Sequence, residues 1–129
     1  MEITNVKPII VLISITILIA IGSPLSAHHG TAAFNTEEVT VKGTVTSFVF
    51  VNPHCQVYWE TKNEKGETEK WQGELTAPTK LTRAGWTKNT LKAGDTITVS
   101  GQTVKSGNRT MWIRKMIGPD GKPMQLFED

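Results

Sequence analysis

Alternating β-branched residues at positions 39–51 constrain the fold of this chain more than any other feature. The stretch reads VTVKGTVTSFVFV, and apolar residues recur at every second position along most of it. This period is typical of a strand with one buried face. Gly43 within the run indicates a bulge or sharp bend, and Asn52-Pro53 is expected to end the strand. The valines expected on the buried face are Val39, Val41, Val45, Val49 and Val51.

Further strand patterns follow, separated by polar turns that contain glycine. In the second strand, alternation places Cys55, Val57 and Trp59 on one face and His54, Gln56 and Tyr58 on the other. A short helix is expected at residues 77–86, with proline in its first turn and glycine at its end. The remaining strands are expected at residues 54–62, 68–75, 96–103 and 109–117, with a final short strand ending near residue 127.

This order of elements predicts an all-β domain of five to six strands with one short helix between strands three and four. It is the layout of the OB-fold, a partly open Greek-key barrel. Barrel closure also removes the strand edges that an open sheet would expose. A simple up-and-down barrel is the main alternative.

The first 27 residues have the pattern of a secretory signal peptide. Lys7 precedes the uncharged apolar run PIIVLISITILIAI, and small residues lead up to Ala27. The run is shorter than the roughly 20 residues of a membrane-spanning helix. We expect cleavage after Ala27, an extended lead-in at residues 28–38, a barrel domain at residues 39–129, and a periplasmic or secreted location. The alternative is an uncleaved anchor, which would be the only part of the chain in contact with a membrane.

Charge and cysteine content narrow the classes of function. The chain carries 14 basic and 12 acidic side chains, interspersed along the sequence, and loses one of each with residues 1–27. Without a basic cluster, nucleic acid is not an expected partner. Cys55 is the only cysteine, so no internal disulfide can form.

Several short motifs resemble those of a group of small exported bacterial proteins of unknown function. The motifs are Ala-His-His-Gly at residues 27–30, Gly-Thr-Val at 43–45, Asn-Pro-His at 52–54, Trp71, Glu74, Pro78, Leu81, Arg83, Gly-Trp at 85–86 and Leu-Lys-Ala-Gly-Asp at 91–95. The resemblance covers nearly all of the chain after residue 27. It implies export and an OB-like barrel, and it brings no activity and no catalytic residues.

The three histidines of the chain are the candidate metal ligands. Cleavage after Ala27 would give His28 a free α-amino group, whose pKa near 8 lies below that of lysine. The amine and imidazole of His28 can chelate a divalent metal, and His54 could supply a third nitrogen. His29 offers a competing chelate through its ring and its backbone nitrogen. Nitrogen donors favour copper, with zinc next. Alternatively, His28 and His29 belong to a mobile tail without a ligand.

Cys55 beside His54 suggests a thiol nucleophile, but adjacent strand residues point to opposite faces. We therefore expect Cys55 in the core and no catalytic residue here. A second candidate site is a set of aromatic and charged residues that would suit a small organic ligand. These are Tyr58, Trp71, Glu74, Arg83 and Trp86. The competing interpretation places the tryptophans in the core and pairs Arg83 with Glu74.

The sequence thus predicts an exported binding module for copper, zinc or a small ligand, and it favours binding over catalysis. One alternative is a copper enzyme that uses the His28 amine and imidazole with His54. Another is a structural module that docks to a periplasmic protein through its aromatic face.

Overall fold

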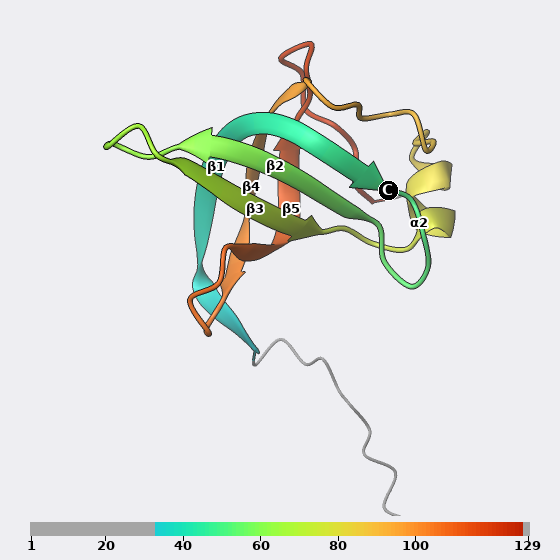
Figure 1. The fold of residues 1–129 in the computed structure, drawn as a ribbon. Helices are drawn as coiled ribbons and strands as arrows, with labels where there is room; N and C mark the ends of the chain where they lie inside the picture. Colours follow the sequence, from blue (N-terminus) through green and yellow to red (C-terminus); the bar gives the residue numbers. More distant parts are fainter. Residues whose placement is uncertain (1–32, 128–129) are drawn as a thin grey trace, which may run out of the picture.

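The computed structural model describes residues 33–127, which form five strands and one short helix (Figure 1). The elements are β1 (Phe34–Val49), β2 (Gln56–Lys62), β3 (Thr68–Glu74), α2 (Pro78–Arg83), β4 (Thr96–Val104) and β5 (Thr110–Ile117). The predicted all-β class, with the helix between the third and fourth strands, is confirmed. Within the described range, no helix has the length and apolar character needed to cross a membrane.

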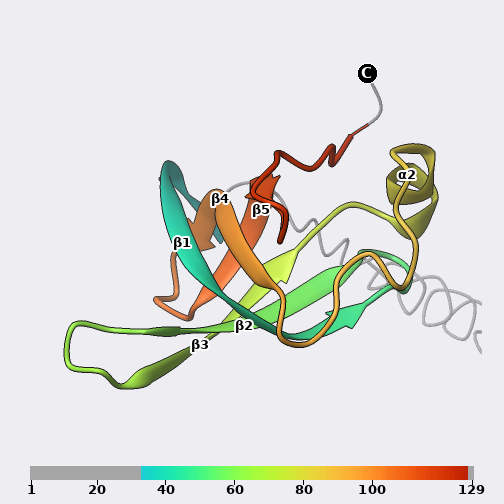
Figure 2. The ribbon, with the colours of Figure 1, turned by 90° about the horizontal axis from the view of Figure 1, so that it is seen from above.

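The strands close into a barrel in the order β1-β2-β3-β5-β4, and β1 pairs with both β2 and β4. The β3–β5 pair is parallel, whereas the other neighbours are antiparallel. The parallel pair excludes an up-and-down barrel, in which consecutive strands pair antiparallel throughout. The connectivity is that of an OB-type Greek-key barrel. Figure 2 shows α2 at the same end of the barrel as the β1–β2 connection.

The buried face of β1 changes along its length because the strand contains an irregularity. Its register against β2 shifts between Val45 and Ser47, and such a bulge reverses which residues face inward beyond it. Phe48 therefore packs against the core, while Val51 is 48% exposed. The prediction that Val51 shares the buried face of Val45 is wrong for this reason. Val39, also predicted to be buried, is 38% exposed near the start of the strand.

Gly43 is not the site of the bulge in β1, which was one of the two features predicted there. The register shift of β1 lies beyond it, between residues 45 and 47. A Cβ atom at Gly43 would lie 2.6 Å from Cδ1 of Trp59 and would also collide with the backbone of Glu60. The absence of a side chain therefore allows β1 to pass close to β2.

The two ends of the barrel domain differ from the expected boundaries. β1 begins at Phe34, which pairs with Val104, so the last residues of the predicted lead-in belong to the barrel. Near the described C-terminus, only an isolated bridge joins Ile117 to Pro123. Within residues 33–127 the barrel therefore has five strands, and the sixth is not formed.

The α2 helix ends in a Schellman motif that carries Trp86 into the core. Pro78 occupies its first turn, and Gly85 follows its end with φ of +87°. The amide of Gly85 donates to the carbonyl of Thr82, and the amide of Trp86 donates to that of Leu81. This pair of hydrogen bonds with a left-handed glycine is a common helix end. Both predicted helix signals are confirmed.

The core fills the barrel with aliphatic and aromatic side chains. The predicted alternation in β2 is confirmed, because Cys55, Val57 and Trp59 are each fully buried. Trp59 stacks on Trp71 of β3 with ring centroids 5.9 Å apart and planes inclined by 16°. The other buried members are Val45, Leu75, Leu81, Trp86, Leu91, Ile97, Val99, Met111, Ile113, Met116 and Leu126.

Candidate functional site

His54 lies just before β2, and the backbone hydrogen bonds of the next residue, Cys55, fix the direction of the His54 side chain. The amide of Cys55 donates to the carbonyl of Thr76, and the amide of Leu75 donates to the carbonyl of Cys55. The β2–β3 ladder therefore continues to Cys55, whose side chain points inward. Because neighbours in an extended chain alternate, His54 points to the outer face of the barrel. Its side chain is 40% exposed.

Glu74 at the end of β3 is the partner of His54. Its register neighbours are Gln56 on β2 and Trp112 on β5, so it lies in the middle of the outer face of these three strands. The carboxylate oxygen Oε1 contacts Nδ1 of His54. Among the described residues, the other imidazole nitrogen, Nε2, has no hydrogen-bond partner. The pair therefore orients an imidazole and leaves one nitrogen available.

Trp112 of β5 packs against the other side of the imidazole. The two rings meet edge to face, with centroids 5.4 Å apart and planes inclined by 82°. On its far side, Trp112 contacts Phe34 at the start of β1, with centroids 6.4 Å apart. Such edge-to-face pairs are favourable arrangements of aromatic rings. Three aromatic side chains thus connect the beginning of the described chain to His54.

Next to the His54–Glu74 pair, polar side chains on the outer face of β2 and β3 form a separate hydrogen-bonded group. The hydroxyl of Tyr58 donates to Oε1 of Gln56 over 2.5 Å, and Nε2 of Gln72 donates to the same oxygen over 3.0 Å. Tyr58 and Gln72 are cross-strand partners. The group extends the outer face beyond the His54–Glu74 pair, with its hydrogen-bonding atoms largely engaged with one another.

The structure directs two of the other predicted ligand-binding residues, both tryptophans, toward the core. Trp86 is 3% exposed, and its Nε1 donates to the carbonyl of Gln125 over 2.7 Å. Trp71 stacks on Trp59 and packs against the core. Arg83 lies exposed in the last turn of α2. Of the five predicted residues, Tyr58 and Glu74 therefore share the outer face with His54. Trp112 completes this face, although it was not among the predicted site residues.

The proposed metal ligands are only partly within the structure. His28 and His29 lie outside residues 33–127. In that range, no three His, Cys, Asp or Glu side chains come together as a metal site. Cys55 is buried on the opposite side of the strand from His54, and burial raises the pKa of its thiol, with an opposing effect from a backbone hydrogen bond at Val51. A thiolate nucleophile paired with His54 is therefore not formed.

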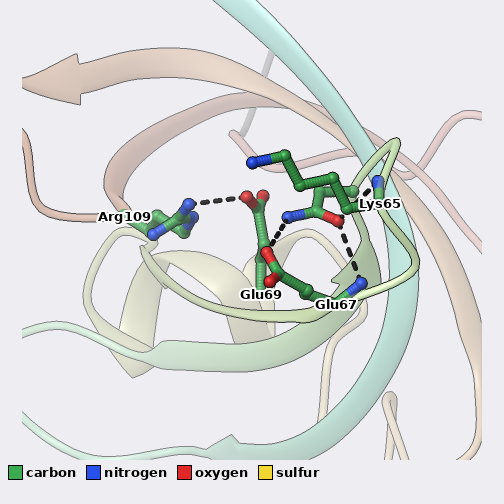
Figure 3. Close-up of polar contacts among 5 residues, drawn as sticks. Lys65, Glu67, Glu69 and Arg109 are labelled. Carbon is green, nitrogen blue, oxygen red and sulfur yellow. Dashed lines mark hydrogen bonds and ion pairs between the residues drawn. The ribbon is translucent and has the colours of Figure 1, made fainter.

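A second polar cluster lies at the far end of β3, in the hairpin with β2 (Figure 3). Side-chain Oδ1 of Asn63 accepts hydrogen bonds from the amides of Lys65 and Glu67, which shapes the predicted turn. Arg109 donates to Oε1 of Glu69 over 2.6 Å, and this hydrogen bond lowers the pKa of the Glu69 carboxyl. The pair ties the β4–β5 loop to β3.

The fold and these contacts define a class: an OB-type barrel that carries an oriented imidazole on the outer face of β2, β3 and β5. The chain belongs to DUF6152, a family of unknown function, which it matches over residues 16–112. That range includes His54, Glu74 and Trp112. No curated protein matches the sequence significantly.

Proposed function

We propose that this protein is an exported module that binds one divalent metal ion, with Cu(II) favoured and Zn(II) next. In this proposal the leader is removed after Ala27, and the new terminal residue, His28, chelates the metal through its amine and imidazole. Nε2 of His54 is the third nitrogen. The proposal assigns binding and no reaction.

The observation that carries the proposal is the contact between Nδ1 of His54 and the carboxylate of Glu74. Metal-binding histidines usually donate their second ring N–H to a carboxylate or a carbonyl, which fixes the tautomer and raises the basicity of the ligating nitrogen. Here the carboxylate on Nδ1 leaves Nε2 as the ligating atom. Trp112 holds the imidazole plane from the side.

The position of Phe34 supports a contribution from the N-terminal histidine. The two centroid distances, 6.4 Å from Phe34 to Trp112 and 5.4 Å from Trp112 to His54, place the outer rings at most about 12 Å apart. Six residues of extended chain, from His28 to Phe34, span up to about 20 Å. The chain is therefore long enough for the His28 nitrogens to reach the imidazole of His54.

The donor set supports the choice of metal. An amine and two imidazoles are nitrogen ligands, for which Cu(II) has the highest affinity among the divalent first-row metals. All three ligands must be unprotonated to bind the metal. His29 is the competing ligand, because a chelate of His28 and His29 would hold the metal on the tail without the barrel.

Native mass spectrometry of the protein, expressed from the full sequence with added Cu(II), tests the proposal. We expect a chain that starts at His28 and carries one copper ion. A mature chain that starts at Gly30 or later would contradict the proposal, because both tail histidines would be lost. An uncleaved chain would contradict it as well, because His28 would then lack a free amine.

A further inference from the structure

A cleft on another side of the barrel is lined mainly by apolar side chains. It lies between the outer surface of β4 and β5 and the C-terminal segment at residues 123–127, and its volume is about 370 Å³. Small-molecule sites are typically apolar clefts of roughly 300–1,000 Å³ with a few polar groups. The lining residues are Thr40, Thr98, Ser100, Arg114, Lys115, Met116, Ile117, Pro123, Met124, Leu126 and Phe127.

One end of the cleft is apolar and open to solvent. Ile117 is 41% exposed and Phe127 is 43% exposed, although both are large hydrophobic side chains. Both line the same cleft, with Pro123 bridged to Ile117 and Met124 packed against the core. Exposed apolar side chains that gather at one place mark a binding surface more often than scattered ones do.

The other end of the cleft is cationic. Strand register places Thr98 opposite Ile117 and Ser100 opposite Lys115, so the lining changes from apolar to basic along the strands. Arg114 lacks a partner in the ladder because the register shifts there, and such a bulge redirects side chains. Among residues 33–127, no carboxylate lines the cleft.

Among the described residues, each of the two cations is held by one side chain at the surface. Nζ of Lys115 lies 3.3 Å from Oε1 of Glu38, which is 41% exposed, and a guanidinium nitrogen of Arg114 donates to Oε1 of Gln102 over 3.2 Å. Contacts between exposed side chains of this kind contribute little to stability. A ligand anion could therefore take the place of Glu38.

We propose that this cleft binds a single-chain anionic amphiphile, such as a fatty acid. Its hydrocarbon chain lies against Ile117, Met124 and Phe127, and its carboxylate meets Lys115 and Arg114. The order of apolar and cationic groups along the cleft matches the order of tail and head in the ligand. This site shares no residue with the proposed metal site, so it does not depend on that proposal.

The test is an NMR titration of the protein, expressed from the full sequence and purified, with decanoate below its micelle concentration. The uncharged control ligand is 1-decanol. We expect saturable shifts at the amides of Thr98, Ser100 and Ile117, and tighter binding of decanoate than of decanol. Shifts spread over all exposed apolar residues, equal affinity for the two ligands, or binding to micelles alone would overturn the proposal.

Three variants separate the contributions of head and tail. Lys115→Gln should weaken decanoate binding about threefold and leave decanol unchanged, as expected for an exposed charge pair. Glu38→Gln removes the competing carboxylate and should strengthen decanoate binding. Phe127→Ala should weaken both ligands by about tenfold, because apolar contact area is lost. Val51→Ala, at an exposed valine outside the cleft, is the matched control. If Glu38→Gln leaves decanoate affinity unchanged, the carboxylate does not meet Lys115 and the proposed orientation is wrong.

Discussion

Two glutamates of β3 form pairs with basic side chains, and the two pairs differ in what they leave available. Glu69 near the hairpin end accepts a hydrogen bond from Arg109, and Glu74 at the other end contacts His54. A guanidinium has only donors and stays charged, so the first pair can only fasten the β4–β5 loop. An imidazole has a second nitrogen that can accept a proton or a metal. The partner, rather than the carboxylate, decides which pair can bind a ligand.

Replacing His54 should give the largest effect on metal binding. We expect His54→Ala to lower Cu(II) affinity by at least about 100-fold, because loss of a ligand costs more than the 10- to 100-fold typical of its supporting group. Competition with a chromophoric chelator measures the dissociation constant. Gln72→Ala, on the same outer face, is the control and should leave affinity unchanged. Equal affinity of His54→Ala and the parent would show that copper is held by the tail alone.

Replacing Glu74 should give the next largest effect and compares the two pairs directly. Glu74→Gln keeps the shape of the side chain but removes the charge that supports His54. We expect a loss of about 10- to 100-fold in Cu(II) affinity, measured by the same competition. Glu69→Gln is the matched control on the same strand and should have no effect. Equal losses in the two variants would mean that the carboxylates act through overall charge.

The Glu69–Arg109 pair should have a smaller effect, seen as a pH dependence of stability. The hydrogen bond to Arg109 lowers the pKa of the Glu69 carboxyl below its ordinary value of 4.5. Its stabilising contribution is therefore complete above that value and is lost as pH falls through the lower folded-state pKa. Urea midpoints should be slightly higher for the parent than for Glu69→Gln near neutral pH. The difference should vanish in strong acid; a difference that grows there would contradict the sign.

Much of the fold could be predicted from the sequence, because the positions of the strands and their buried faces depend on the local alternation of apolar and polar residues. In the strand predicted at residues 54–62, alternation predicts Val57 inside and His54 outside, and both positions are confirmed. The bulge in β1 lies beyond Gly43, the only residue that indicated one, and because of this bulge Phe48 rather than Val51 packs on the core. A bulge is decided by pairing with another strand, which a period of two residues cannot reveal.

The candidate site was predictable only in part. The sequence predicts Glu74 as a ligand-binding residue, yet its contact with His54 depends on the β2–β3 register. Trp112 reaches the same face through the parallel pairing of β5 with β3, which joins strands far apart in the sequence. Trp86 has the residue type of a ligand platform, but the Schellman motif directs it into the core. Long-range pairing therefore decides which candidates meet.

A double-mutant cycle on His28 and His54 is the most direct test of whether the two residues bind the same copper ion. Cu(II) dissociation constants would be measured for the parent, His28→Ala, His54→Ala and the double variant. Groups that bind the same ion are energetically coupled. We therefore expect His54→Ala to lower Cu(II) affinity by at least about 100-fold in the parent and by less than about twofold once His28 is replaced. An equal cost of His54→Ala in both backgrounds would contradict a shared metal site.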